Sequence, residues 1–174
     1  MTEKTGNIIL IGMPTSGKST VGVILAKMLG MDFLDTDIVL QRKEGSKLQT
    51  IIETQGIDTF LRKEERAVLG IQTGHSVIAT GGSVVYSEAA MKHLSEGGTV
   101  VYLKITPEKL KKRLTDVRGR GVVLRPGESL EEMFAERAAL YERYGDITVT
   151  ETGTIEDTVR EVLEELQKLS GKSF

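Results

Sequence analysis

The feature that most constrains this chain is an apolar run that leads directly into a glycine-rich segment ending in a lysine and hydroxyl residues. Residues 9–22 read ILIGMPTSGKSTVG. The segment from Gly12 to Ser19 matches the pattern G-x-x-x-x-G-K-S/T at every fixed position. The apolar run at 7–12 predicts a buried strand, and the apolar spacing over 18–29 predicts an amphipathic helix. The chain must therefore fold so that this loop connects a strand to a helix.

Each residue type in the loop suits the binding of phosphate. Glycines let the backbone approach an anion, and the N–H groups of the loop and of the helix N-terminus form a positive concavity. The ammonium of Lys18 can bridge terminal phosphates, and the hydroxyl of Ser19 can hold Mg²⁺. A glycine turn with an exposed lysine is the alternative, but it does not explain the order of elements. The candidate nucleotide-binding residues in the loop are Gly12, Pro14, Thr15, Ser16, Gly17, Lys18, Ser19 and Thr20.

Short apolar runs at 76–82, 99–105 and 146–150 also predict buried strands, and MDFL at 31–34 predicts another. Helical patterns lie between them, among them a helix opened by Pro107 and one opened by Ser129 and Glu132 as a capping box. Alternating strands and helices predict parallel crossovers. We therefore expect a three-layer α/β/α fold with a central parallel sheet, in which residues 1–174 form a single domain with its ligands at the carboxyl ends of the strands.

Composition excludes several classes of protein. Lysine and arginine number 23 against 25 aspartates and glutamates, so the net charge of -2 gives no overall attraction to nucleic acid or to an anionic membrane. The chain has no cysteine and no tryptophan, which excludes a disulfide scaffold and disfavours a base-stacking binder of single strands. We expect a cytoplasmic monomer with no nucleic-acid or membrane partner.

Two acidic residues and an irregular stretch are further candidates for the active site. Asp35 and Asp37 follow the predicted strand at 31–34, so one can reach a metal shell and the other a substrate hydroxyl. The alternative is an aspartate that caps the next helix. The glycine- and arginine-rich stretch 116–129 suggests an active-site lid, although its arginines could also be ordinary solvated charges.

Together these segments resemble the shikimate kinase family, small P-loop kinases of the nucleoside monophosphate kinase fold. The resemblance covers nearly the whole chain. Its segments are the phosphate loop GMPTSGKSTVG, FLDTD at 33–37, IIETQGIDTFLRKEE at 51–65, VIATGGS at 77–83, VRGRGVVLRP at 117–126 and ERAALYERY at 136–144. The resemblance implies a small helical substrate-binding segment at about 33–62 and a lid at about 116–128.

The resemblance also implies roles for individual residues. Lys18 and Ser19 would contact nucleotide phosphate and Mg²⁺, with Asp35 in the outer shell of the metal. Asp37 would hold the accepting hydroxyl and could act as base. Acceptor binding would fall to the backbone N–H groups of Gly81 and Gly82 and to Arg137, which would pair with a substrate carboxylate. Arg113 would cover the adenine.

The chain departs from the family pattern in the segments that would bind the acceptor. The family arginine expected to bind the shikimate carboxylate falls on Leu61, with Arg62 one place further along a predicted helix, a step of about 100°. Ser83 replaces the third glycine of the glycine-rich turn, and Ile57 replaces a glutamate. We keep Arg62 and Ser83 as candidate substrate-binding residues.

The lid arginine has three candidates. Arg125 is the catalytic candidate beside Lys18 and Asp37, and Arg120 is a nucleotide-binding candidate, with Arg118 as the remaining alternative.

The implied activity is ATP-dependent phosphorylation of an alcohol group of a small molecule, with shikimate as the leading acceptor and ATP and Mg²⁺ as cofactors. One alternative is a kinase of another hydroxy acid, a polyol or a nucleotide. A second is a regulatory protein that binds nucleotide without transferring phosphate. A P-loop GTPase or motor is disfavoured because no N-K-x-D base-reading motif follows.

Overall fold

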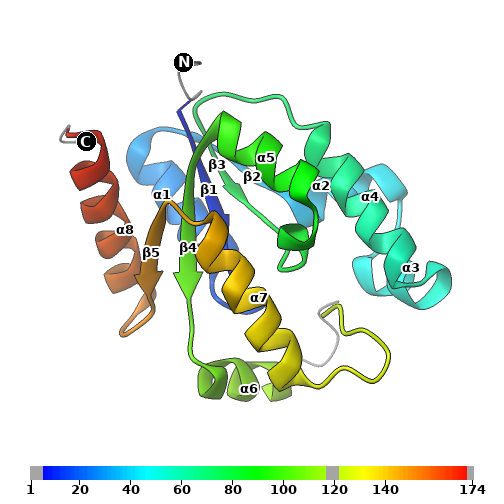
Figure 1. Ribbon diagram of the computed structural model, residues 1–174. Coiled ribbons are helices and arrows are strands. Elements are labelled where there is room, and N and C mark those ends of the chain that lie inside the picture. Colours follow the sequence, from blue (N-terminus) through cyan, green and yellow to red (C-terminus); the bar gives the residue numbers. More distant parts are fainter. Residues whose placement is uncertain (1–5, 117–121, 172–174) are drawn as a thin grey trace.

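A five-stranded parallel sheet forms the centre of the protein (Figure 1). The computed structural model describes residues 6–116 and 122–171. The strands are β1 (Asn7–Ile11), β2 (Asp32–Asp35), β3 (Ser76–Ala79), β4 (Gly98–Lys104) and β5 (Ile147–Thr150). Their order is β2-β3-β1-β4-β5, with Ile9 of β1 opposite Ile78 on one side and Val100 on the other. The predicted central parallel sheet is confirmed.

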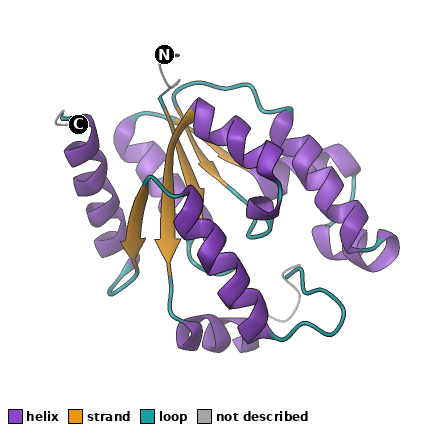
Figure 2. Cartoon of the chain, viewed as in Figure 1, coloured by secondary structure: helices purple, strands orange, loops and turns teal. Residues whose placement is uncertain are grey.

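Helices cover both faces of the sheet (Figure 2). They are α1 (Lys18–Leu29), α2 (Thr36–Glu44), α3 (Leu48–Gln55), α4 (Ile57–Leu69), α5 (Glu88–Gly97), α6 (Pro107–Asp116), α7 (Leu130–Tyr144) and α8 (Ile155–Ser170), with a 3₁₀ turn η1 (Val84–Tyr86). Val21 of α1 and Val162 of α8 pack in one hydrophobic cluster on the sheet, whereas Met91 of α5 and Met133 of α7 belong to the cluster on its other face. The three-layer α/β/α prediction is therefore confirmed.

Helices α2, α3 and α4 stand beside the β2 edge of the sheet and have a hydrophobic cluster of their own. Leu40, Ile51 and Phe60 are its buried centre, and Val123, from the segment before α7, packs with them. These helices occupy the region that was expected to bind substrate, residues 33–62. The cluster fixes them in one arrangement, so that polar side chains on their inner faces keep a constant position.

Local signals in the sequence explain where several helices begin and end. Ser129 and Glu132 form the predicted capping box of α7, and Pro107 opens α6. Residues 122–128 of the expected lid form no helix or strand, whereas Arg118 and Arg120 lie outside the described residues. Within residues 6–116 and 122–171, no helix is both long and apolar enough to cross a membrane.

Candidate active site

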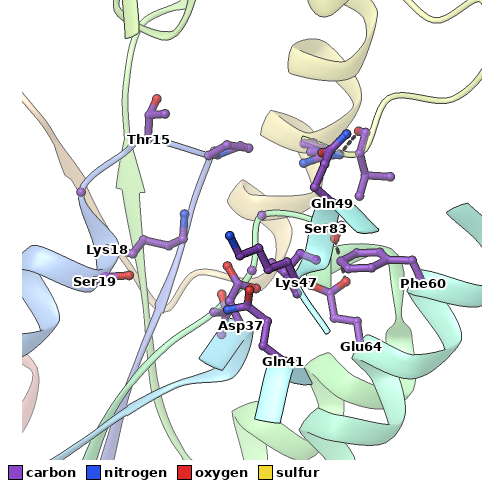
Figure 3. A pocket seen from close by; sticks show the side chains of 18 of the residues that line it. Thr15, Lys18, Ser19, Asp37, Gln41, Lys47, Gln49, Phe60, Glu64 and Ser83 are labelled. Atoms are coloured by element: carbon purple, nitrogen blue, oxygen red, sulfur yellow. Dashed lines mark hydrogen bonds between the residues drawn. The ribbon is translucent and has the colours of Figure 1, made fainter. Parts of the chain in front are cut away.

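A cavity of about 370 Å³ lies where the phosphate loop, the glycine turn after β3 and helices α2 to α4 meet (Figure 3). It is at the carboxyl ends of the central strands, which is where α/β sheets bind ligands. It contains these sequence-predicted residues: Pro14, Thr15, Gly17, Lys18, Ser19, Thr20, Asp37, Gly81, Gly82, Ser83 and Arg137. The fold thus brings residues separated by more than a hundred positions into one site.

In the phosphate loop, the side chain of Lys18 is hydrogen-bonded to the backbone of the loop itself. Lys18 Nζ donates to the carbonyl oxygens of Gly12 at 2.8 Å and Met13 at 2.7 Å. Burial lowers the pKa of Lys18 to about 8, although the charge of Asp37 acts in the opposite direction. Gly17 has φ 85° and Thr15 has φ 66°, and a positive φ is strained for threonine. The strain is consistent with a loop shaped for a ligand.

Ser19, Asp35 and Asp37 form a connected group at the start of α1 and α2. Ser19 Oγ donates to Asp35 Oδ2 at 2.6 Å, and Asp35 Oδ1 accepts from the backbone N–H of Asp37 at 2.9 Å. Asp35 is therefore the N-cap of α2 and also the partner of Ser19, so the cap is confirmed, while its place in a metal shell stays a prediction. Burial and the nearby charge of Asp35 raise the pKa of Asp37 to about 6, against the effect of Lys18, which suits a general base near neutral pH.

These oxygens fit a magnesium ion that is held mainly by a nucleotide. Among the described residues, no group of three or more His, Cys, Asp or Glu side chains could form a metal cage. Mg²⁺ commonly uses one or two protein oxygens together with substrate phosphates and water. Ser19 Oγ and the Asp35 carboxylate, already in hydrogen-bond contact, supply that limited donor set.

Arg137, on α7, also lines the cavity. Its side chain is only 1% exposed, its Nε donates to Tyr86 Oη at 3.1 Å, and its Nη2 donates to the carbonyl of Val123. A Cβ built on Gly82 would lie 3.2 Å from Arg137 Nη1 and 2.9 Å from Pro14 Cδ. Tyr141 Oη donates to the Gly82 carbonyl. The bare Gly82 thus leaves Nη1 beside the cavity with room to meet an anion.

Gly81 is also confined at this turn. Its backbone N–H already donates to Thr36 Oγ1 at 3.0 Å, which ties the glycine turn to the start of α2. Any further use of this N–H by a ligand would compete with Thr36.

The other sequence-predicted residues lie outside the lining of the cavity. Arg62 is exposed and donates to Thr59 Oγ1 at 3.1 Å. Arg113 donates to the Thr15 carbonyl at 2.9 Å and pairs with Glu151, so it braces the phosphate loop. Gly12 and Ser16 lie at the loop, where both contact Lys18 Nζ.

Arg125 also lies outside the lining. It is paired with Glu136 at 3.0 Å and lies 4.9 Å above the ring centroid of Tyr86.

Sequence reasoning missed several residues of the cavity wall. They are Gln41, Lys47, Leu48, Gln49, Phe60, Glu64, Thr80 and Val123. A signal existed for one of them: Glu64 lies on the same apolar stripe as Phe60 and Val68, and an acid on the buried face of a helix is uncommon without a role. Burial raises the pKa of Glu64 to about 7, while a hydrogen bond from Ser83 lowers it.

Comparisons with known proteins identify the family of this chain. The family model described as Shikimate kinase matches residues 14–167. The shikimate kinase of Thiobacillus denitrificans is 34% identical, over 98% of this chain and 96% of its own length.

Two solved structures are similar in fold and sequence. The shikimate kinase of Aquifex aeolicus aligns with a TM-score of 0.82 at 32% identity, covering 94% of this chain and 98% of that one. The enzyme of Acinetobacter baumannii, solved in complex with shikimate, aligns with a TM-score of 0.81 at 30% identity, covering 98% of this chain and 96% of that one. The chain belongs to the shikimate kinase family and is an ATP-dependent phosphotransferase.

Proposed function

We propose that this protein transfers the γ-phosphoryl group of ATP to a hydroxyl of shikimate. The observation that carries the proposal is that Lys18, Asp37 and Arg137 all line one cavity. A phosphate anion suits Lys18 and an acceptor carboxylate suits Arg137. The complex of the related Acinetobacter baumannii enzyme with shikimate supports this choice of acceptor.

The nucleotide occupies the loop side of the cavity. Backbone N–H groups of the loop hold the phosphates, and Lys18 leaves the carbonyls of Gly12 and Met13 to contact the terminal phosphates. Ser19 and Asp35 hold Mg²⁺, which when bound neutralises charge between the β- and γ-phosphates. Arg113, anchored by Glu151, lies beside Thr15 where it can cover the adenine.

The acceptor occupies the side formed by α2, α4 and the glycine turn. Asp37 accepts the hydrogen of the reacting hydroxyl and aims its oxygen at the γ-phosphate for in-line attack. Arg137 Nη1 pairs with the acceptor carboxylate, and Gly82 offers its backbone N–H. Leu61 carries no charge and cannot pair with the carboxylate. Arg137 is the buried arginine in the described wall of the cavity, so this role falls to it.

Closure of the lid completes the site. Arg125 must leave Glu136 and Tyr86 to reach the γ-phosphate, and both contacts are at an exposed surface where exchange is inexpensive. Arg118 and Arg120 are the other candidates for this cation. Closure would also exclude water that would otherwise hydrolyse ATP.

The direct test is ADP release in the presence of ATP and Mg²⁺ with a panel of acceptors. Shikimate should give turnover, whereas quinate, gluconate and nucleoside monophosphates should give little. Turnover with another compound and none with shikimate would refute the proposed acceptor.

Two substitutions separate transfer from simple nucleotide binding. Lys18→Ala should abolish turnover because it removes the ammonium at the phosphates. Asp37→Ala should retain nucleotide affinity and lose turnover. A wild-type protein that binds nucleotide in calorimetry but releases no ADP with any acceptor would be a regulatory protein instead.

We further propose that the enzyme is a single-domain monomer of the cytoplasm, where ATP is supplied and where a chain without cysteine needs no oxidising environment. Light scattering coupled to size exclusion should give a mass near 19.1 kDa. A mass twice as large would refute the monomer.

A further inference from the structure

Glu64 is a buried carboxylate that the proposed reaction leaves unused. It projects from α4 into the cavity wall and is only 4% exposed. Its Oε2 accepts a hydrogen bond from Ser83 Oγ at 2.7 Å, whereas its Oε1 is buried and has no hydrogen-bond partner. A buried polar atom without a partner costs about 1–3 kcal/mol, and more when charged. Such an atom at a cavity wall indicates a ligand that supplies the missing donor.

The free oxygen of Glu64 lies close to Asp37. A Cβ built on Gly81 would overlap Glu64 Oε1 and would lie 2.8 Å from Asp37 Oδ1. The two carboxylate oxygens therefore both lie close to the Cα of Gly81, and both residues line the cavity. Figure 3 shows the carboxylates of Asp37 and Glu64 on the same side of the cavity. A molecule held by Asp37 through one hydroxyl would bring an adjacent hydroxyl within reach of Glu64.

Among the described residues, no cation neutralises Glu64 directly. Lys18 and Arg137 face the same cavity, but neither forms an ion pair with it, and both are engaged by backbone carbonyls. Leu61, one turn earlier on α4, is apolar. The site around Oε1 is thus unsuited to an anion and suited to a neutral donor such as an alcohol.

We infer that Glu64 Oε1 binds a second hydroxyl of the acceptor, adjacent to the hydroxyl that is phosphorylated, and that Ser83 is the positioning residue for this carboxylate. The inference rests on the proposed function, since it assumes an acceptor with neighbouring hydroxyls. It assigns a role to Ser83, the residue that stands in place of a glycine. The Ser83 hydroxyl fixes Oε2 and so leaves Oε1 as the oxygen that lacks a partner among the described residues.

The contact makes Glu64 a specificity residue. A site built to bind a hydroxyl rejects an analogue that lacks it, because the buried polar group is then left without a partner. A hydrogen bond to a charged group contributes about 1.5–3 kcal/mol, which corresponds to roughly a 10- to 100-fold preference.

The test removes the contact in two ways, by deleting a hydroxyl of the acceptor and by deleting the carboxylate of Glu64. Shikimate, 4-deoxyshikimate and 5-deoxyshikimate are compared as acceptors for the wild type and for Glu64→Ala, with kcat/KM and the acceptor Kd from calorimetry as readouts. The only hydroxyl adjacent to the 3-hydroxyl of shikimate, the expected phosphorylation site, is on C4, so the wild type should discriminate against 4-deoxyshikimate by about 10- to 100-fold and much less against 5-deoxyshikimate. In Glu64→Ala this preference should shrink to within about 3-fold, because the loss of either partner already removes the contact.

The chain offers a matched control. Glu65, the next residue on α4, also accepts from a serine hydroxyl, Ser87 Oγ at 2.6 Å, but it does not line the cavity. Glu65→Ala should keep the wild-type preference. Ser83→Ala should weaken the preference in the wild-type background and should have no further effect in the Glu64→Ala background.

The outcomes separate this inference from the proposed function. If the wild type does not turn over shikimate, the proposed acceptor is wrong. If the wild type turns over shikimate and Glu64→Ala discriminates against both analogues as strongly as the wild type does, the role of Glu64 alone is refuted. The nucleotide Kd verifies that each variant is folded. Glu64→Gln serves as a further variant that removes the charge but keeps the volume of the side chain.

Discussion

Single charged residues in this cavity are held at an energetic cost that a ligand can offset. Burial lowers the pKa of Lys18 to about 8 and raises the pKa of Asp37 to about 6 and of Glu64 to about 7. In each case the protein disfavours the charged form because it has removed water from the group. Phosphate and alcohol groups of bound substrates would replace that water, so the same groups that reduce stability prepare the site for catalysis.

Glu64 gives a prediction about stability and pH. Its pKa in the folded protein, about 7, is higher than its usual value of 4.5, so the folded state binds the proton more tightly. The contribution of Glu64 to stability is therefore fully present below about pH 4.5 and is lost as the pH rises toward 7. Glu64→Gln should raise the free energy of unfolding at pH 8 by about 1–3 kcal/mol and much less at pH 5.

Urea denaturation at the two pH values measures this difference. Glu65→Gln is the control, since its carboxylate is not in the cavity, and it should change stability little at either pH. A Glu64→Gln variant that is less stable than the wild type at pH 8 would contradict the expected penalty of the buried charge.

A second prediction is that substitutions of Arg137 and Arg62 have different effects on the KM for shikimate. Arg137 is buried at the cavity and held by Tyr86 and Val123, whereas Arg62 is exposed and bonded only to Thr59 among the described contacts. Arg137→Lys keeps the charge but loses the planar fork, so KM for shikimate should rise about 10-fold or more. Arg62→Ala should change KM less than about 3-fold. Equal effects of the two substitutions in steady-state kinetics would mean that Arg62 reaches the acceptor.

At the scale of elements, the sequence predicted β1, α1 and α7 well because each carries strong local signals. The loop pattern lies between β1 and α1, and apolar periodicity together with a capping box marks α7. By contrast, α3 was not predicted, since its eight residues carry no cap side chain and are stabilised by packing against α4. Local sequence cannot show such packing.

The residues of the candidate site also differ in whether local sequence could predict them. The loop residues were found from a contiguous pattern, whereas Glu64 and Lys47 belong to the cavity through the tertiary arrangement of α2 to α4. For Asp35, local sequence left open whether it capped α2 or served a metal site; the contacts show the cap through Oδ1 and leave Oδ2 bound to Ser19.

The close contact between α1 and the sheet gives a third prediction. A Cβ on Gly22 would lie 2.7 Å from Phe33 Cε2 and 3.2 Å from Leu10 Cδ1. Gly22→Ala gains about 1 kcal/mol of helix propensity but overpacks this contact at a cost of about 1–3 kcal/mol. The net effect should be a loss of stability.

Val23 is the matched control because it is the next residue on the same helix and is 51% exposed. Val23→Ala should be neutral or stabilising by about 0.5 kcal/mol, from propensity alone. Thermal or urea unfolding compares the two variants, and a stabilised Gly22→Ala would show that the helix moves away from the sheet without cost.

At the scale of the whole molecule, the cavity lies between two parts that are joined by helix α4. The sheet and its covering helices contain two hydrophobic clusters and α2 to α4 contain most of a third, but Val68 of α4 packs in the sheet cluster that contains Met91. Val123 joins the third cluster, and its carbonyl also accepts from Arg137 of α7, which packs on the sheet. A ligand that contacts Asp37, Glu64 and Arg137 together would therefore bind across the boundary between these parts.

Hydrogen exchange should show this coupling directly. At about 100 times its Kd, an acceptor bound with ADP stabilises the liganded state by about 2.7 kcal/mol, so amides that exchange only when the cavity opens should slow by up to about 100-fold. We expect the slowing in α3 and the first half of α4, which pack in the third cluster, and little change in the C-terminal half of α8, around Val162 and Leu166, which packs on the far face of the sheet. The Glu64→Ala variant, which lacks one bridging contact, should show a smaller effect in α4 at equal saturation. Slowing that is as large in α8 as in α4 would instead mean that the two parts open as one unit.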